Sequence, residues 1–444
     1  MTEMTPKRPN VLFIDCHDLG RHLGCYGRPT VVSPNLDALA ADGVKFDQHF
    51  CTAPQCSPSR ATLYTGRYAH SVGMLGLAHP PFDWRLNAGV RYLPEYLREV
   101  GWSTHLVGVQ HVTRDDDEYV LALGFDSRRS PQAAAPEIAR ECSKLIAELD
   151  EPWFINVGFV EPHRDASGRF AGHAAVTEYG VDVPDYLPDN LAARTEMAQI
   201  QGAIKDVDDA VGAILSELEA TGAAADTLVV FTTDHGLALP RAKAGMFDPG
   251  IEVALMMRWP AAGIVGGVAV DELTSHVDLL PTLLEALGIL PPANLQGASM
   301  WPWLTANSAP PTDRLVFAEK TFHTAYEPQR AVRSARYKLI ANLEADIMNV
   351  PGDVLRSPIT PTMIDEIVSE RPPVELYDLA TDPGERHNLH GAPELMAVEA
   401  ELKAALVSWM RETDDPLLRG PVSSPFKEAA FRELGLPASA DPYS

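Results

Sequence analysis

The chain has 444 residues and a mass of 48.3 kDa, which is long enough for two or three domains and a large core. Apolar residues make up 45% and charged residues 22%, a globular composition that excludes intrinsic disorder, collagen-like repeats and coiled coils. Lys and Arg number 36 and Asp and Glu 61, so the formal net charge is −25. A surface this acidic repels phosphate backbones, and we therefore expect no nucleic-acid partner.

Cysteine usage and the N-terminal residues bear on the compartment. Five cysteines are too few for a disulfide framework, and the odd count leaves at least one thiol free. Residues 1–9 (MTEMTPKRP) contain no apolar segment of the kind that a signal peptide needs. No apolar stretch approaches the ~20 residues of a membrane span. We therefore expect a cytoplasmic protein without a membrane partner.

The first two thirds of the chain alternate short apolar runs with helical patterns. The apolar runs predict strands at residues 11–14, 104–109, 153–159, 228–233 and 253–257. Helical periodicity predicts helices at residues 35–41, 90–100, 136–149 and 191–220. Such runs are typical of strands buried on both faces of a parallel sheet, so the alternation predicts an α/β fold with helices on both faces. Ligands in folds of this class bind beyond the carboxyl ends of the strands.

The pattern changes after residues 305–312 (TANSAPPT), which we predict to be a linker. Beyond it, the sequence predicts strands at 333–343 and 374–379, a turn at 382–384 and an amphipathic helix at 393–412. These elements indicate a smaller α+β domain with an antiparallel sheet.

We therefore expect a catalytic domain at residues 1–308 and a smaller domain at 309–444 that completes the substrate pocket. C-terminal tails such as residues 420–444 often pack on a partner or on a domain junction, so a homo-oligomer is compatible with this sequence.

Residues 56–67 (CSPSRATLYTGR) carry the most specific chemical pattern. Pro58 suits the start of a helix, which places Cys56 at a helix N-terminus, where free N–H groups and the dipole favour an anion. Arg60 lies four residues on, on the same helix face, and can neutralise that anion. Because a lone cysteine before a helix is more often structural, the interpretation depends on the whole pattern, C-x-P-S-R followed by T-G-R.

This pattern resembles the signature of type I sulfatases in the alkaline-phosphatase superfamily. The resemblance implies that a formylglycine-generating enzyme oxidises Cys56 to formylglycine, whose hydrate is the nucleophile. It also implies an alkaline-phosphatase-like fold, with a mixed, mostly parallel sheet flanked by helices. Residues 73–77, 161–164 and 409–416 are similar to the heparan N-sulfatase (sulfamidase) branch, and the resemblance extends over nearly the whole chain.

The resemblance also implies one divalent cation, with two ligand pairs that each follow a predicted strand. The matching positions are His17, Asp18, Asp234 and His235, together with the modified Cys56. His17 stands where most of the family carries aspartate, and Asp15 is the alternative ligand. The family default is Ca²⁺, but two imidazoles with two carboxylates shift the preference towards Mn²⁺ or Zn²⁺.

Three further positions match catalytic groups of the family. The resemblance implies that His163 protonates the leaving atom and that His111 takes the proton of the second hydroxyl of the nucleophile. It implies that Arg60 and Lys243 hold the sulfate oxygens. Val109 departs from the pattern, because typical sulfatases carry a lysine there, and this departure leaves room for a less charged anion.

In the second predicted domain, His323 resembles a substrate-facing position of sulfamidase. Arg330 or Arg333 could meet an acidic sugar, with surface loop residues as the alternative interpretation.

The sequence thus favours a sulfatase that hydrolyses a sulfate ester or sulfamate of a small substrate with a sugar or aryl leaving group. Two alternatives remain open. One is a phosphodiesterase or phosphonate monoester hydrolase of the same superfamily, and the other is a non-catalytic protein that binds sulfated sugars.

Overall fold

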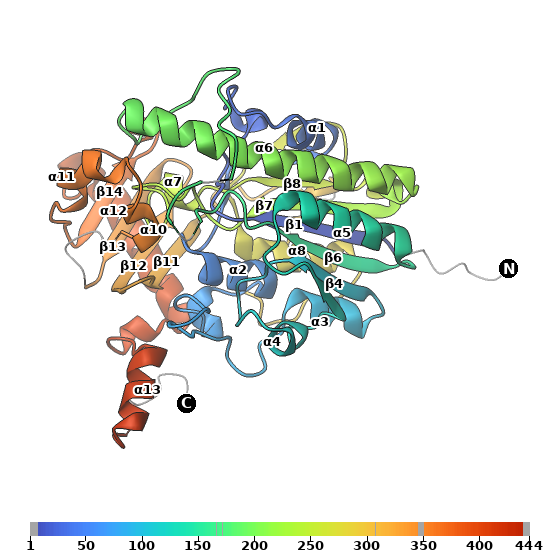
Figure 1. Ribbon diagram of the computed structural model, residues 1–444. Coiled ribbons are helices and arrows are strands. Elements are labelled where there is room, and N and C mark those ends of the chain that lie inside the picture. Colours follow the sequence, from blue (N-terminus) through green and yellow to red (C-terminus); the bar gives the residue numbers. More distant parts are fainter. Residues whose placement is uncertain (1–7, 166, 171, 307, 345–349, 438–444) are drawn as a thin grey trace.

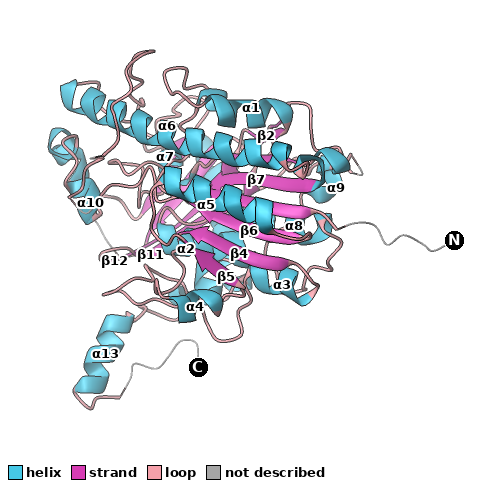
Figure 2. Cartoon of the chain, turned by 45° about the vertical axis from the view of Figure 1, so that its right-hand side comes forward, coloured by secondary structure: helices cyan, strands magenta, loops and turns pink. Residues whose placement is uncertain are grey.

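The computed structural model describes residues 8–437 except 166, 171, 307 and 345–349 (Figure 1). Its centre is an eight-stranded sheet in the order β5-β4-β6-β1-β7-β8-β2-β9, flanked by helices (Figure 2). A four-stranded antiparallel sheet, β11-β12-β13-β14, follows later in the chain. This is the mixed, mostly parallel fold with a C-terminal antiparallel sheet that the sequence predicts.

The strands of the large sheet are β1 (Asn10–Cys16), β2 (Val44–Phe46), β4 (Ser103–Gly108), β5 (Ser127–Arg129), β6 (Trp153–Gly158), β7 (Thr227–Thr233), β8 (Leu255–Arg258) and β9 (Val268–Val270). β3 (His49–Phe50) and β10 (Thr274–Ser275) form a separate pair. The small sheet consists of β11 (Val316–Phe322), β12 (Tyr326–Arg333), β13 (Tyr337–Asn342) and β14 (Val374–Asp378).

The longer helices are α1 (Pro34–Asp42), α2 (Cys56–Thr65), α3 (Leu93–Glu99), α5 (Ala135–Glu148), α6 (Leu191–Ala220), α8 (Leu279–Ala286), α12 (Met396–Glu412) and α13 (Pro425–Glu433). The shorter ones are α4 (Asp117–Leu121), α7 (Asp248–Ile251), α9 (Trp301–Leu304), α10 (Gly352–Leu355) and α11 (Ile364–Ile367). No helix in the described part of the chain is long and apolar enough to cross a membrane.

Alternating side chains of β1 show why the strand is apolar throughout. Leu12 and Ile14 pack into the core that α5 and α6 cover, whereas Val11 and Phe13 pack into the core beneath α2, α3 and α8. Successive strand residues point to opposite faces, so a sheet covered on both sides needs apolar residues at every position. The parallel pairing of β1 with β6 and β7 then brings the carboxyl ends of these strands to one edge.

The structure departs from the sequence-based expectation at several places. β8 pairs antiparallel with β7, although its apolar run is indistinguishable from that of a parallel strand. The helix predicted at 90–100 begins at Leu93 and ends at Glu99. Strands β11 and β12 were not predicted as separate elements, because their polar residues (Glu319, Lys320, Gln329) are buried and hide the alternation.

Between β13 and β14 the chain returns to the large sheet. Val354 of α10 and Ile359 are fully buried in the core that α5 and α6 share. Ser357 and Arg164 both hydrogen-bond the buried carboxylate of Glu196 on α6, and these bonds fix the segment in place. This packing matters for function because α10 carries Asp353, an acid that faces the site described below.

Buried histidines make the stability of the fold sensitive to acid. Burial, together with the charge of Arg28, lowers the pKa of His22 from 6.5 to about 3. Between these values the unfolded chain binds one more proton at His22 than the folded chain, so stability rises with pH across this window. Acidification from about pH 7.5 to about pH 5 should lower the free energy of unfolding. We expect this decrease to be about 2 kcal/mol smaller in His22→Asn than in the wild type. Urea unfolding at both pH values measures this, and equal losses in the two proteins would contradict it.

Candidate active site

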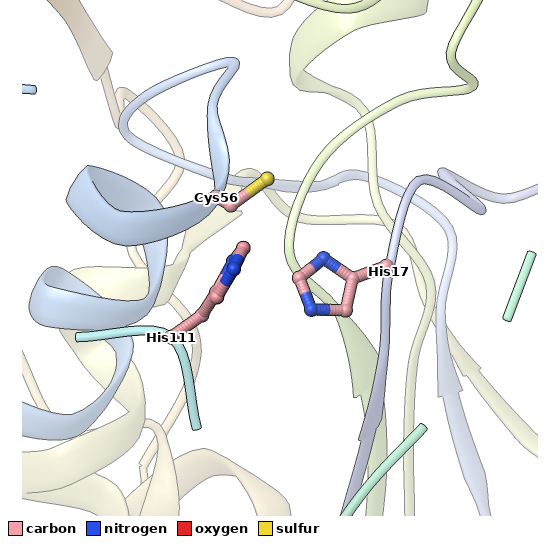
Figure 3. A group of neighbouring side chains, drawn as sticks. All are labelled: His17, Cys56 and His111. Carbon is pink, nitrogen blue, oxygen red and sulfur yellow. The ribbon is translucent and has the colours of Figure 1, made fainter. Parts of the chain in front are cut away.

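Four neighbouring strands of the large sheet end in polar side chains at one edge. His17 and Asp18 follow β1, His111 follows β4, His163 follows β6, and Asp234 with His235 follows β7. Figure 3 shows His17 and His111 directed, with Cys56, into a common space. Donor atoms of His17, Cys56 and His111 lie within 4.8 Å of one another.

Cys56 is the first residue of α2, as predicted, and is 3% exposed. Its Sγ lies 3.4 Å from Nε2 of His235. Burial raises the pKa of the Cys56 thiol well above its usual value, so the unmodified side chain is a neutral thiol and a weak nucleophile. The free N–H groups at the start of α2 favour negative charge at this position.

Asp234 and His235 are held in one orientation by backbone hydrogen bonds. Oδ1 of Asp234 accepts from the N–H groups of Asp18 and of His235, each at 2.9 Å. Nδ1 of His235 donates to the Gly236 carbonyl at 3.0 Å, which leaves the Nε2 lone pair free to face Cys56 and Asp18. An imidazole whose Nδ1 is fixed in this way presents Nε2 to a metal ion.

The side chains of His17, Asp18, Cys56 and Asp234 form a compact group of candidate metal ligands. One donor atom from each lies within 4.8 Å of the others, and all four residues are buried. Nδ1 of His17 lies 2.9 Å from Oδ2 of Asp234, and Oδ1 of Asp18 lies 3.2 Å from Nε2 of His235. Burial lowers the pKa of His17 to about 4, so its imidazole is neutral near pH 7. Two carboxylates and the neutral imidazole of His17, with the side chain of residue 56, fit a divalent cation.

Asp15, the alternative ligand, is committed elsewhere. Its carboxylate forms an ion pair with Arg60 and accepts hydrogen bonds from Tyr64 and from Asn156. The structure thus gives its carboxylate a structural role in the core beneath the site.

Arg60 has partners other than those predicted. It is fully buried, and its guanidinium contacts Asp15, Oδ2 of Asp234 at 3.2 Å and the Cys16 carbonyl at 3.2 Å. All three nitrogens face protein groups, because α2 packs directly on the ends of β1 and β7. In this arrangement Arg60 orients Asp234, and it is a positioning residue.

Lys243 lies between three site residues. Its Nζ lies 2.9 Å from Oδ2 of Asp18, 3.0 Å from Nε2 of His163 and 2.9 Å from Oδ2 of Asp353. Burial opposes ionisation of the ammonium, but the charges of Asp18 and Asp353 outweigh burial and hold the pKa of Lys243 well above its usual value. Nδ1 of His163 donates to the Arg164 carbonyl at 2.6 Å, so Nε2 accepts from Lys243.

His111 is aimed at the site by strained backbone. Its φ of 62° lies in the left-handed region, which non-glycine residues rarely adopt and which recurs at functional sites. Oε1 of Gln110 accepts from the N–H groups of Val112 and Thr113 and holds this turn in place. Burial, with the neighbouring His17 ring and the charge of Arg60, keeps the pKa of His111 well below its usual value, so its ring is neutral.

The three candidate substrate-binding residues lie in different parts of the structure. His323 lies near Lys243 and Asp353, and burial together with the Lys243 charge lowers its pKa to about 3. Arg330 is fully buried on Asp415, and Arg333 pairs with Asp248. Arg333 lines a cavity with Arg28 and Tyr186, and its hydrogen bonds go to Asp248 and Ser334. Of the three, His323 is the one whose pKa is shifted by the charges of Lys243 and Asp353.

Two residues of the site were not predicted. Asp353 comes from α10, more than a hundred residues from Lys243, in a segment without strand or helix periodicity. His79 stacks on His111 with ring centroids 5.5 Å apart. The sequence near His79, which reads LAHPPFDW from Leu77, offers a proline-rich turn and no spacing signal for such a contact.

The nucleophile position, the acid–histidine pairs and the sheet define a class of hydrolase with an alkaline-phosphatase-like catalytic edge. The model of the sulfatase family matches residues 9–289, and that of the N-sulphoglucosamine sulphohydrolase C-terminal region matches residues 239–350. The chain belongs to the sulfatase family, whose members hydrolyse sulfate ester and sulfamate bonds.

Relatives of known activity match along almost the whole chain. Human N-sulphoglucosamine sulphohydrolase is 28% identical over 93% of this chain and 92% of its own length. Bovine arylsulfatase A is 27% identical over 93% of this chain and 92% of its own length.

Solved structures share the fold. A protein in complex with its substrate D-glucosamine-2-N,6-O-disulfate matches with a TM-score of 0.72 at 19% identity, over 94% of this chain and 99% of that one. The phosphonate monoester hydrolase of Agrobacterium radiobacter matches with a TM-score of 0.68 at 24% identity, over 91% of this chain and 96% of that one.

Asp353 places a negative charge where a substrate anion would meet Lys243. Replacement Asp353→Asn removes this charge 2.9 Å from the ammonium, so we expect inorganic sulfate to inhibit turnover with a Ki lower by roughly 5-fold or more. Asp365→Asn, an exposed change on nearby α11, is the matched control and should leave Ki unchanged. A higher Ki in Asp353→Asn would mean that Asp353 serves only to hold Lys243 in place.

Proposed function

We propose that this protein hydrolyses a sulfate ester or sulfamate of a small substrate through a formylglycine formed from Cys56, with one divalent cation. The observation that carries the proposal is the position of Cys56. Cys56 is the first residue of α2, and its Sγ lies 3.4 Å from Nε2 of His235. One donor atom each of Cys56, His17, Asp18 and Asp234 lies within 4.8 Å of the others. The proposal is also supported by the complete C-x-P-S-R pattern, which a formylglycine-generating enzyme would recognise. That enzyme would be a partner of this protein during maturation.

The cation would be held by His17, Asp18, Asp234 and His235 with the side chain of residue 56. Bound there, it would act as a Lewis acid and lower the pKa of a hydroxyl of the formylglycine hydrate. With His17 in place of a carboxylate, the donor set is less negative than an all-oxygen site. We therefore favour Mn²⁺ or Zn²⁺ over Ca²⁺.

The side chains around residue 56 divide the remaining work. Lys243 would bind the sulfate oxygens, and in doing so it would exchange its contact with Asp353 for one with the substrate. Nε2 of His163 accepts from Lys243, so a proton taken up at this atom would be passed to the leaving oxygen or nitrogen. Neutral His111 would accept the proton of the second hydroxyl. Arg60 and Gln110 position Asp234 and His111 without touching the substrate.

A phosphodiester or phosphonate monoester hydrolase is the second candidate. Val109 in place of a lysine, and Asp353 on the Lys243 ammonium, leave little uncompensated positive charge for the anion. A sulfate ester, a sulfamate and a phosphodiester each carry a single negative charge near neutral pH, so this arrangement disfavours a dianionic phosphate monoester and suits either candidate. Turnover of a sulfate ester, a sulfamate and a phosphodiester with one metal would separate the candidates. Binding of a sulfated sugar without turnover, despite complete aldehyde formation, would favour the non-catalytic alternative.

The expected cytoplasmic location stays a prediction.

The modification of Cys56 is tested directly by mass. Co-expression with a formylglycine-generating enzyme should convert the thiol in the peptide that contains Cys56 to the aldehyde, as read by mass spectrometry. Cys56→Ala should lose turnover by at least about 1,000-fold, because the nucleophile is absent. Activity of Cys56→Ala close to that of the wild type would contradict the proposed mechanism.

The metal preference depends on His17. Metal-free protein should gain more thermal stability from Mn²⁺ or Zn²⁺ than from Ca²⁺, because binding to the folded state alone stabilises it. His17→Asp restores an additional carboxylate, so the order should shift towards Ca²⁺. Melting temperatures with each ion, and calorimetric titration of the same samples, measure the effect without any turnover. An unchanged order of ions in His17→Asp would show that His17 does not set the preference.

A further inference from the structure

An aromatic cavity of about 300 Å³ adjoins the candidate active site. Phe82 and Trp84 line it from the loop after His79, Phe322 and Tyr326 from the β11–β12 hairpin, and Phe426 from α13. The rings pack against one another, with centroids 5.0 Å apart for Trp84 and Phe322 and 4.9 Å apart for Phe322 and Tyr326. The walls thus come from three distant parts of the chain.

Two connections lead from this cavity to the reaction centre. The first is His323, which lines the cavity and also lies close enough to Lys243 and Asp353 for their charges to shift its pKa. Neither ring nitrogen of His323 has a hydrogen-bond partner among the described residues. The second is a row of neighbouring rings. His111 stacks on His79 with ring centroids 5.5 Å apart, and the centroids of His79 and Phe82 are 5.4 Å apart.

The lining of the cavity is apolar and uncharged. Among the described residues that line it there is no Lys, Arg, Asp or Glu, and its polar side chains are those of Trp84, His323, Thr324, Tyr326 and Ser424. Aromatic walls stabilise flat rings or the apolar face of a sugar by stacking, whereas a second sulfate or a carboxylate would lose its hydration here without gaining a counter-charge.

We propose that this cavity, lined by Phe82, Trp84, Phe322, Tyr326 and Phe426, binds the leaving group of the substrate as an uncharged ring, with His323 as its hydrogen-bond partner. The inference rests on the proposed function, because it places the reacting sulfur at residue 56 and the ring beyond His323. It narrows the substrate class to a compound with one sulfate on an aryl group or on an otherwise uncharged aryl glycoside.

Binding of an unsulfated ring tests the cavity separately from the chemistry. In a Cys56→Ala background, phenyl β-glucoside should bind in calorimetric titration and change the tryptophan fluorescence, because Trp84 lines the cavity. Adding Phe426→Ala should weaken this binding roughly 3- to 10-fold, the loss expected for one stacked ring. Phe426 is 69% exposed, so its removal should leave the fold intact. Leu434→Ala, at an exposed position directly after the same helix and outside the cavity, is the matched control and should bind like the parent.

Turnover by the modified enzyme provides the second readout. Phenyl sulfate should have a lower KM than D-glucosamine-2-N,6-O-disulfate, and Phe426→Ala should raise the KM for phenyl sulfate with little change in kcat. Absence of phenyl β-glucoside binding, or equal binding by Phe426→Ala and its parent, overturns the cavity proposal even if sulfate esters are hydrolysed. Binding that follows the expected pattern, with no turnover of any sulfate, would instead overturn the proposed function and leave the cavity assignment standing.

Discussion

A buried group of charges, Asp15, Arg60 and Asp234, ties the catalytic edge together. Their side chains are at most 1% exposed and come from β1, α2 and the end of β7. Removing one partner from such a group leaves an uncompensated charge in the interior and costs about 3–5 kcal/mol. The same contacts set the register between the helix that starts at Cys56 and the strands that end at the proposed metal ligands.

Negative charge around Cys56 is balanced in two ways. Asp18 and Asp234 form part of the cluster that suits a divalent cation, whereas Asp353 and Asp18 hold the ammonium of Lys243. Because the latter contacts already satisfy Lys243, the site offers limited attraction to a highly charged substrate. The uncharged aromatic cavity beyond His323 is consistent with the same preference for a substrate of low charge.

Several site positions could be predicted because each follows a recognisable local pattern. Asp18, Asp234 and His235 terminate apolar runs, and Cys56 precedes the proline that starts α2. Arg60 shows the limit of such reasoning. Helix periodicity places it on the same face as Cys56, yet the packing of α2 on β1 and β7 turns its guanidinium inwards to Asp15 and Asp234.

The sequence by itself determined the family, the α/β class and the strand ends that carry the polar residues, because these follow from local spacing and from burial on both sheet faces. Only the tertiary structure decided that Asp353 meets Lys243, that Arg333 turns to Asp248, and that Phe426 reaches the aromatic cavity. These contacts join residues far apart in the chain. Their partners are chosen by the packing of loops and of the small sheet against the large one, for which no local periodicity exists.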